Sequence, residues 1–486
     1  MELLEKLRDQ FDEQLVYKDP QKTAFFLNLG LPSYLRDWIL KHYSSPEGEC
    51  DFTAVQNFIS RRIPTTNDNW KELQNRIIND GETVSILARI NVQFDVQKRN
   101  IHFTLPDLGV PAKDTIIEPY DWDRLESQRS LLSSRPTWGM IDLAYRYPQL
   151  EGTPKIPGAI RLVGFKPFGM NNLDVDYYRE VSRKFEFDEW LDVLLGAVDY
   201  NAQGFANRAQ KIAILTRILP FIEKRLNLIE LAPKGTGKSY LYGRVSRYGW
   251  LASGGKITRA KMFYDMNKKE EGLIAKNDFV VLDEVQTVSF DNDDELRSAF
   301  KGYLESGSCT VGSHETSSFS GFVLSGNISK QHMDEYDNMF TELPEDFHES
   351  ALIDRFHGFI KGWDIPRMHE DMKIHGWGLN TEYFTSILHE LRNVDYTSLF
   401  EDLLEFPDRA DTRDVTAILR ITSAYLKLFF PFVQTKEDLN YELFKEHCLD
   451  RAVRMRKIIK YQLGLLDPGE FLNKEVPQPR IKGYDC

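Results

Sequence analysis

The stretch Ala232-Pro-Lys-Gly-Thr-Gly-Lys-Ser239 decides the fold, because it follows a short apolar run at residues 226–231 and precedes a helical pattern. A strand, a glycine-rich loop and a helix in this order form a phosphate-binding loop, whose glycines let backbone N–H groups close around phosphate oxygens. The general pattern G-x-x-x-x-G-K-[ST] begins with glycine, whereas this chain has Ala232. Alanine permits most loop geometries, so the stretch predicts a nucleotide-binding loop.

The loop also predicts the ligands. Lys238 is expected to reach the β- and γ-phosphates, and Ser239 to place its hydroxyl on Mg²⁺, a cation that prefers oxygen ligands. We therefore expect ATP and Mg²⁺ as cofactors. The other positions expected to bind the nucleotide are Lys234, Gly235, Thr236, Gly237 and Tyr240.

A second element is Phe279-Val-Val-Leu-Asp283-Glu284, an apolar strand that ends in two carboxylates. Asp283 can hold Mg²⁺ through water, and Glu284 can polarise the attacking water as the catalytic base. Standing alone, the acidic pair would also fit a strand that leads into a turn. Behind a phosphate-binding loop it favours hydrolysis over mere nucleotide binding.

Two further positions fit a hydrolytic site. Asn327 ends the apolar run 321–327 and suits a sensor of the γ-phosphate, although it could instead cap a turn with Gly326. Arg355 precedes a strand pattern at the place where AAA+ ATPases carry an arginine finger, which stabilises charge on a neighbouring subunit's γ-phosphate. The alternative for Arg355 is an ion pair with Asp354.

The helical pattern that begins near Asp411 carries two arginines, Arg413 and Arg420. Either one could contact nucleotide phosphates as a second sensor, and we favour Arg413. Arginines on helices are more often solvated, so this alternative stays open.

Short apolar strands alternate with helices, which predicts an α/β fold with a parallel sheet covered by helices. Residues 371–464 show no comparable strand but several amphipathic stretches, so they predict a helical lid whose last helix ends at Gly464, before Pro468. The strands of the sheet are expected at residues 226–231, 279–282, 321–324 and 356–363.

The N-terminal part differs in pattern. Helical patterns at 34–43 and 53–62 precede residues 84–105, where apolar and polar residues alternate on both sides of Lys98 and Arg99, and this predicts a β-hairpin with a basic tip. The expected domains are a mixed α/β domain at 1–110, a connecting segment with a helical lead-in at 111–205, the ATPase core at 206–370, the lid at 371–464 and a tail at 465–486.

Composition excludes several classes of protein. No apolar run approaches the ~20 residues that span a bilayer, and the mean hydropathy of −0.43 is typical of a soluble protein. The net charge of −13 argues against coating nucleic acid by bulk electrostatics. The four cysteines stand far apart without a C-x-x-C pair, so neither disulfides nor zinc are indicated and a reducing cytoplasm is expected.

The motifs together resemble the BrxL family, the Lon-like AAA+ ATPases of BREX phage-defence systems. The resemblance rests on LNLIELAPKGTGKSY, LASGGKITRAKMFY, FVVLDEVQTV, VLSGNIS and, most distinctive, LIDRFHGFIKGWDIPRM, and it extends weakly upstream over almost the whole chain. The ATPase part is similar to minichromosome-maintenance helicases. In particular, RDVTAILRITSAYLK resembles their lid helix and supports Arg413 as the second sensor.

This resemblance implies a homo-oligomeric ring, hexameric by analogy, that moves along or remodels double-stranded DNA in defence against phage, alongside other defence components and without a membrane. A nucleotide-gated DNA-binding scaffold and a protein-remodelling ATPase are the alternatives. Family members carry a protease-like domain after the lid, and residues 465–486 are too few to form one, so we expect no proteolysis.

DNA contacts are expected from the N-terminal domain and from pore loops between residues 304 and 320. The basic candidates in the N-terminal domain are Arg61, Arg62, Lys98 and Arg99. For each of them an ordinary solvated surface position is the simpler explanation.

Overall fold

A computed structural model describes residues 3–19, 23, 25–26, 29, 31–45, 47–64, 67–134, 136–149, 156–168, 173–267, 269–290 and 294–484. The chain forms two compact units. The α/β unit comprises Met1–Ala24, Leu31–Asp37 and Asn172–Cys486, and the barrel unit comprises Phe25–Gly30 and Trp38–Asn171. The barrel unit runs past the boundary expected near residue 110, because residues 115–116, 137–146 and 159–167 of the expected connecting segment are strands of its sheet. The first part of the chain belongs to the α/β unit instead.

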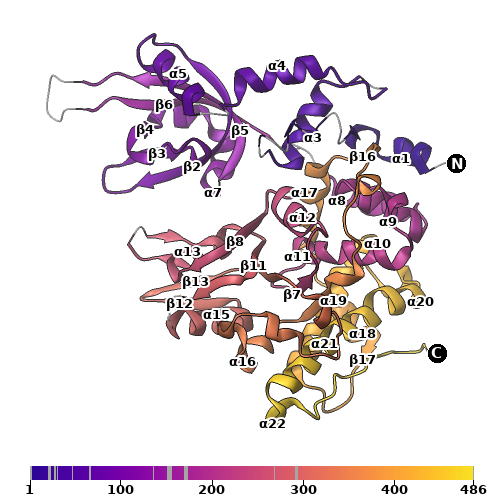
Figure 1. Ribbon diagram of the computed structural model, residues 1–486. Coiled ribbons are helices and arrows are strands. Elements are labelled where there is room, and N and C mark those ends of the chain that lie inside the picture. Colours follow the sequence, from indigo (N-terminus) through magenta and orange to yellow (C-terminus); the bar gives the residue numbers. More distant parts are fainter. Residues whose placement is uncertain are drawn as a thin grey trace. The chain divides into compact units, whose positions relative to one another are not determined.

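The α/β unit is built around a parallel sheet of five strands (Figure 1). The order across the sheet is β15-β7-β14-β11-β8, which is 5-1-4-3-2 in chain order, and every neighbouring pair is parallel. The predicted parallel α/β sheet is therefore confirmed, with the strand order of the AAA+ class. The strands are β7 (Asn227–Ala232), β8 (Gly249–Ile257), β11 (Phe279–Phe290), β14 (Gly321–Asn327) and β15 (Gly358–Lys361).

The central strands are apolar because helices cover both faces of the sheet. All six residues of β7 are buried, as are the first six of β14. Parallel strands covered in this way appear in the sequence as continuous hydrophobic runs, which is why they could be recognised there. Their side chains, together with those of α15 (Asp294–Ser306), belong to one hydrophobic core.

The sequence did not predict β8. This strand pairs with β11 at the edge of the sheet, and most of its residues are only half-buried or exposed. Its segment GWLASGGKI contains Gly254 and Gly255, both with positive φ, at 56° and 81°. An edge strand with a solvated face and a glycine kink carries no apolar run from which to recognise it.

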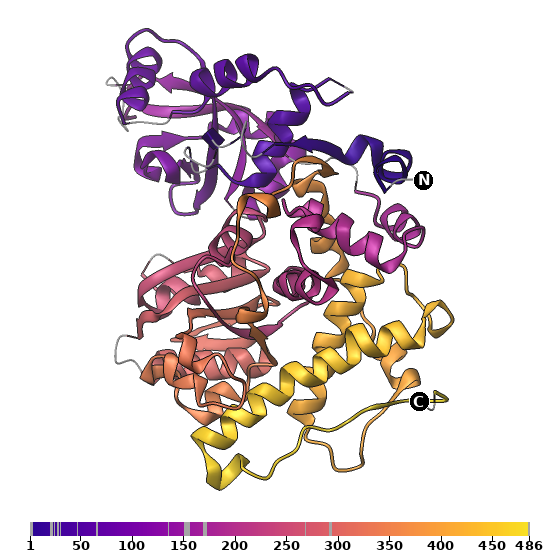
Figure 2. The same ribbon diagram turned by 45° about the vertical axis from the view of Figure 1, so that its right-hand side comes forward.

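The predicted helical lid is present and contains α17 (Thr381–Leu391), α18 (Thr397–Leu403), α19 (Thr412–Phe429) and α21 (Asp450–Leu466). Helices α19 and α21 lie side by side (Figure 2). The last long helix ends at Leu466, two residues beyond the expected Gly464. Pro468 opens a further short helix, α22 (Pro468–Phe471), in which it takes the first position.

Two short strand pairs were also missed. In the α/β unit, β1 (Leu15–Lys18) pairs antiparallel with β16 (Gly376–Leu379), a contact across more than 350 residues. The tail is tied down by β18 (Arg480–Ile481), which pairs with β17 (Leu404–Glu405). Two- to four-residue strands made by distant partners leave no local periodicity, so the sequence alone does not show them.

The barrel unit contains a sheet of order β3-β2-β5-β6-β4. Its ends meet, because the Ile117 N–H donates to the Ile101 carbonyl at 2.7 Å and Thr115 bonds to the backbone of Phe103. The strands are β2 (Val84–Asp95), β3 (Asn100–Thr104), β4 (Thr115–Ile116), β5 (Thr137–Arg146) and β6 (Ala159–Pro167).

In chain order the closed barrel reads 1-2-3-5-4-1, with β4 parallel to β6 and the other pairs antiparallel. Helices α6 (Pro119–Arg124) and α7 (Arg129–Ser134) lie between the third and fourth strands in sequence. This is the topology of the OB fold. The predicted hairpin is confirmed as β2 and β3, and Arg99 at its tip has φ 55°.

The helices expected near 34–43 and 53–62 are α3 (Ser33–His42) and α4 (Phe52–Arg62). The second one begins at an N-cap, since the Asp51 side chain accepts from the Ala54 N–H at 2.9 Å.

Candidate functional site

The phosphate-binding loop lies at the carboxyl end of β7 and leads into α12 (Lys238–Arg244). Gly235 and Gly237 have φ of 83° and 80°, a left-handed conformation that favours glycine. A Cβ at Gly237 would also stand 2.9 Å from the Tyr200 hydroxyl. Both glycines are therefore required by the backbone geometry of the loop, as the motif indicates.

Lys238 lies inside this loop, with its ammonium 3.4 Å from the Ala232 carbonyl and 3.3 Å from Asn327 Oδ1. Burial lowers the pKa of Lys238 more than the nearby carboxylates of Glu230 and Asp283 raise it. The position thus brings a desolvated cation to the place where a phosphate anion would compensate for its lost hydration.

Ser239 and Asp283 come together across the loop and the neighbouring strand. The Ser239 hydroxyl donates to Asp283 Oδ2 at 2.6 Å, and the Ser325 hydroxyl donates to the other carboxylate oxygen at 2.9 Å. Asp283 is buried, whereas Ser239 is exposed. These side chains offer the hydroxyl and carboxylate oxygens that Mg²⁺ takes from proteins, so the donor set fits the expected metal.

Glu284 adopts a left-handed backbone conformation, with φ 52°. The pairing of β11 with β8 shifts in register between Asp283 and Val288, so Glu284 begins a bulge and its side chain is exposed. Non-glycine residues pay roughly 1–3 kcal/mol for such conformations, which cluster at functional sites. The bulge turns Glu284 out of the sheet and towards the cavity described below.

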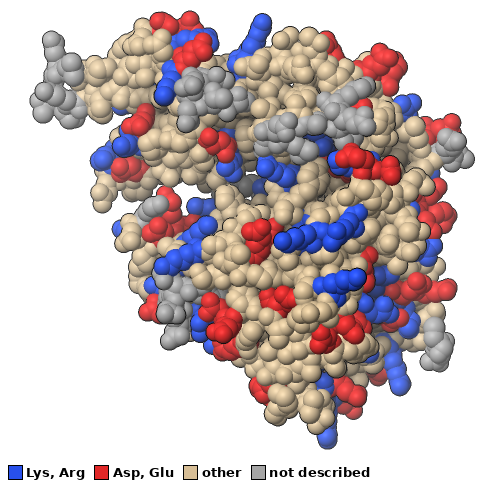
Figure 3. Space-filling view, viewed as in Figure 1, with Lys and Arg blue, Asp and Glu red and all other residues tan. Residues whose placement is uncertain are grey.

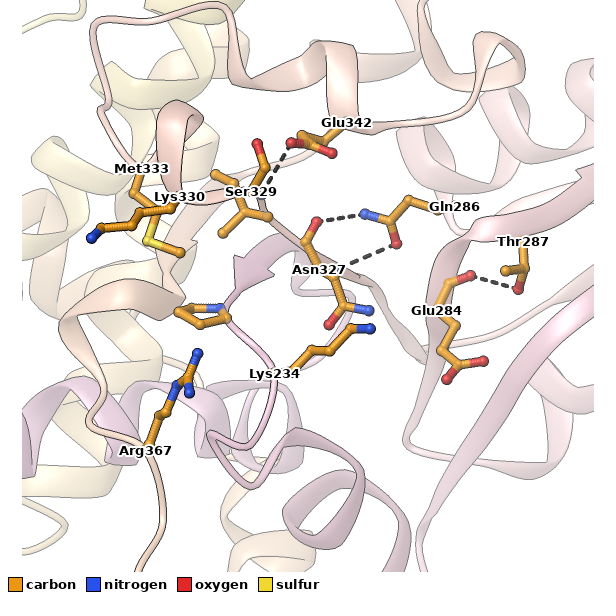
Figure 4. A pocket seen from close by; sticks show the side chains of 12 residues that line it. Lys234, Glu284, Gln286, Thr287, Asn327, Ser329, Lys330, Met333, Glu342 and Arg367 are labelled. Atoms are coloured by element: carbon orange, nitrogen blue, oxygen red, sulfur yellow. Dashed lines mark hydrogen bonds between the residues drawn. The ribbon is translucent and has the colours of Figure 1, made fainter.

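Asn327 is held by a residue that the sequence did not single out. Gln286 donates to the Asn327 carbonyl at 2.5 Å and accepts from the Asn327 N–H at 3.2 Å (Figure 4). This double hydrogen bond ties the end of β14 to the bulge after Glu284. An exposed glutamine two positions beyond an acidic pair has no signature of its own in the sequence.

A buried ion pair is hydrogen-bonded to the phosphate-binding loop. Arg217 and Glu230 are both fully buried, 2.5 Å apart, and Arg217 also donates to the carbonyl and hydroxyl of Thr236, at 2.5 and 2.9 Å. The Tyr242 hydroxyl donates to the second oxygen of Glu230 at 3.0 Å. Neither residue of this pair was singled out from the sequence.

A cavity of about 600 Å³ opens beside the loop, at the carboxyl ends of β7 and β14 and at the bulge of β11. Ligands of open α/β sheets bind at this edge. Figure 4 shows side chains from several segments around it, including Lys234, Glu284 and Asn327 of the expected site and two further cations, Lys330 and Arg367.

The Tyr240 side chain is directed elsewhere. Its hydroxyl donates to Asp199, and Ser33 Oγ lies 2.8 Å from it. Asp199 belongs to a buried cluster with Lys18 (3.0 Å) and Arg36 (2.6 Å). Tyr240 would therefore meet a nucleotide through its backbone rather than its phenol.

Arg355 and Arg413 lie at the other end of the sheet from the loop of their own chain. Arg355 Nε and Arg413 Nη2 are 2.8 and 3.1 Å from the same oxygen of Glu305. Arg225, just ahead of β7, donates to the Glu305 carbonyl at 2.5 Å, whereas the loop leaves β7 at Ala232.

Six strand residues separate these positions by about 20 Å, at ~3.3 Å a residue. Neither arginine is thus brought to its own nucleotide site. The alternative ion pair of Arg355 with Asp354 is not the one formed, because Asp354 pairs with Arg413 at 2.9 Å and with Arg456 at 2.6 Å. Arg420 is engaged with the Arg225 carbonyl and His357, both at 3.0 Å.

The fold and site define the class of the protein. A phosphate-binding loop, a buried aspartate facing its serine and a polar sensor position meet at one edge of a parallel 5-1-4-3-2 sheet, followed by a helical lid. This combination is that of an AAA+ P-loop ATPase domain.

The family follows from comparison with known sequences. Residues 160–477 match the family described as "Lon-like protease BrxL-like, ATPase domain", and residues 9–145 match "BREX system Lon protease-like protein BrxL N-terminal". The chain belongs to the BrxL family, as the motifs indicated.

Two curated relatives are similar over almost the whole chain. The "Lon-like protease BrxL" of Escherichia coli O9:H4 (strain HS) is 28% identical over 474 residues, which are 96% of this chain and 65% of that protein. The protein of the same name from Bacillus cereus (strain H3081.97) is 27% identical over 478 residues, 96% of this chain and 67% of that protein. The chain thus spans about two thirds of the length of these relatives.

Two negative observations hold for the described part of the chain. None of its helices combines the length and apolarity required to cross a membrane. None of its His, Cys, Asp and Glu side chains gather in groups of three or more that could hold a metal ion.

Proposed function

We propose that this chain binds ATP with Mg²⁺ and hydrolyses it between the subunits of a homo-oligomeric ring, in order to move along or remodel DNA in phage defence. The observation that carries the proposal is the division of the expected site between two ends of one sheet. Lys238, Ser239, Asp283, Glu284 and Asn327 gather at one end, and Arg355 and Arg413 at the other.

Such a division favours head-to-tail association. A subunit that carries half a site at each end completes both sites with neighbours in the same orientation. Repeated head-to-tail contacts close into a ring when the rotation between neighbouring subunits allows it. Arg355 would then stabilise charge on the neighbour's γ-phosphate, with Arg413 beside it as a second sensor acting in trans.

Within one subunit the roles follow from the contacts. Ser239 and Asp283 would hold Mg²⁺, which would neutralise charge on the β- and γ-phosphates. Lys238 would bind the phosphates, Glu284 would orient and polarise the attacking water, and Asn327, fixed by Gln286, would contact the γ-phosphate.

Support for DNA as the substrate comes from the barrel unit. OB barrels bind oligonucleotides on the face near their second and third strands and the loop between the first two, which here carries Lys98 and Arg99. Lys98 is 76% exposed. The chain has no bulk positive charge to replace such a site, and Figure 3 shows acidic and basic side chains interspersed on the face in view.

The test is the steady-state ATPase rate with and without double-stranded DNA, alongside the mass in solution. Stimulation by DNA in a large oligomer, abolished in Lys238→Ala, would support a DNA motor. Activity indifferent to DNA would favour protein remodelling. Full function of Glu284→Gln would favour a nucleotide-gated scaffold.

Mixing two inactive variants tests the shared site directly. Glu284→Gln supplies an intact Arg355, and Arg355→Ala supplies an intact Glu284. In a ring mixed at equal amounts, about one quarter of the interfaces would combine both intact residues, so activity should return. No recovery in mixed rings would contradict hydrolysis between subunits.

A further inference from the structure

A carboxylate and two cations of the α/β unit lie on the two surfaces that the proposed ring would bring together. One surface holds Glu305, at the end of α15, between Arg355 and Arg413. The other holds Lys330 and Arg367, at the rim of the 600 Å³ cavity. Resting on the proposed ring, we infer that Lys330 and Arg367 are the docking site for Glu305 of a neighbouring copy, and that Glu305 exchanges its own arginines for them on assembly.

Glu305 is placed to exchange partners. Its side chain is 44% exposed and that of Arg413 is 42% exposed, so water already competes for this ion pair, whereas Arg355 is 17% exposed. Exposed pairs of this kind contribute little to stability. Losing the Arg413 pair on assembly would therefore cost little, and the half-buried Arg355 would exchange Glu305 for the phosphate of the neighbouring copy.

Arg413 is also held by Asp354. This carboxylate is only 3% exposed and pairs with Arg456, which is 1% exposed. Arg413 keeps a second contact here, at 2.9 Å from Asp354. A buried pair is costly to break, so the Asp354 contacts would remain and keep Arg413 in place while Glu305 leaves.

Lys330 and Arg367 have no acidic partner in the part of the chain that the structure describes. Lys330 opens the short helix η7 (Lys330–His332), and Arg367 follows η10 (Gly362–Asp364). Neither forms an ion pair with any described residue, and both are exposed. The carboxylate at the same rim, Glu342, is occupied by the Ser329 N–H and by His332 Nδ1, both at 3.0 Å.

The docking site is rigid where it meets the phosphate-binding loop. The Met368 N–H donates to the Gly235 carbonyl at 2.8 Å, and this hydrogen bond fixes the neighbouring Arg367 against the loop. Figure 4 shows Lys330, Arg367 and Lys234 around the cavity, each from a different segment. An acidic group docked there would bring the freed arginines towards the γ-phosphate of the same cavity.

The occupant is a second copy of this chain, because the two surfaces lie at opposite ends of one sheet. Glu305 stands beside the start of β7, and Lys330 and Arg367 stand beyond the ends of β14 and β15. A subunit cannot pair its own Glu305 with its own Arg367 across that distance, but the next subunit in a head-to-tail ring can.

Charge reversal tests this pairing. Glu305→Arg and Arg367→Glu should each lower assembly, measured as mass in solution against protein concentration, by about 10- to 100-fold, because each puts like charges together. The double variant should regain most of the assembly and the ATPase rate. Glu405→Arg, an exposed acidic residue of the lid, is the matched control and should assemble like the parent.

Three results would overturn the inference: assembly unaffected by either reversal, no recovery in the double variant, or weaker binding of a fluorescent ATP analogue to dilute, monomeric Arg367→Glu. The last result would mean that Arg367 binds its own subunit's nucleotide. Failure of the proposed function would look different, because Arg355→Ala would then hydrolyse ATP at the parent rate whether or not the charge reversal rescues assembly.

Discussion

The buried ion pair beneath the phosphate-binding loop gives the sharpest prediction. Replacing Arg217 by Met leaves Glu230 buried without its cation. Among the described side chains, only the Tyr242 hydroxyl, at 3.0 Å, still contacts that carboxylate. Breaking one side of a buried pair costs about 3–5 kcal/mol. At ~2–4 °C for each kcal/mol, the α/β unit should unfold about 6–20 °C earlier.

The double variant Arg217→Met with Glu230→Gln separates stability from function. Removing both charges of a buried pair is often nearly neutral, so the unfolding temperature should recover to within about 5 °C of the parent, or ~1–2 kcal/mol. The two hydrogen bonds to Thr236 stay lost, however. Hydrogen bonds from charged donors contribute ~1.5–3 kcal/mol each, so ATP should bind about 10- to 100-fold more weakly if even half of this preorganises the loop.

The assays are thermal unfolding followed by circular dichroism and titration with a fluorescent ATP analogue, both on the full chain. Glu230→Gln alone serves as the control, since it removes the charge but keeps Arg217 against Thr236. If the double variant binds the nucleotide as tightly as the parent, Arg217 does not position the loop. If Arg217→Met unfolds at the parent temperature, the pair is not buried as described.

Three more predictions follow from the site. Burial lowers the pKa of Lys238 below the ordinary lysine value of 10.5. Because only the protonated form attracts phosphate, ATP affinity should fall as pH rises through that lowered pKa. An ATP titration at rising pH should show this loss for the parent but not for Lys238→Arg, which stays charged. Gln286→Ala should lower kcat by about 10-fold, the effect of ~1.4 kcal/mol, with ATP affinity nearly unchanged, since it frees Asn327 without touching the loop; an equal loss in binding would count against this role. Lys18→Met should lower the unfolding temperature, because it leaves the buried Asp37 and Asp199 with Arg36 as their remaining basic partner. An unfolding temperature equal to that of the parent would contradict this prediction.

The sequence by itself determined the class of fold and the centre of the site. The buried runs of β7, β11 and β14 are apolar because they are covered on both faces, and the residues needed for chemistry stand at or just beyond the end of each buried run, so pattern and function are read from the same short segments. Lys238, Ser239, Asp283 and Asn327 were identified in this way, and the structure brings them together.

Only the tertiary structure decided the other contacts of the site and the topology of the barrel unit. The partners of Arg355 and Arg413, the double hydrogen bond of Gln286 and the support from Arg217 join residues far apart in the chain, and no local pattern records such contacts. The OB topology likewise depends on which strand ends meet, as at Ile101 and Ile117. Periodicity reports which face of an element is buried, whereas the pairing of distant elements is fixed only when the whole chain has folded.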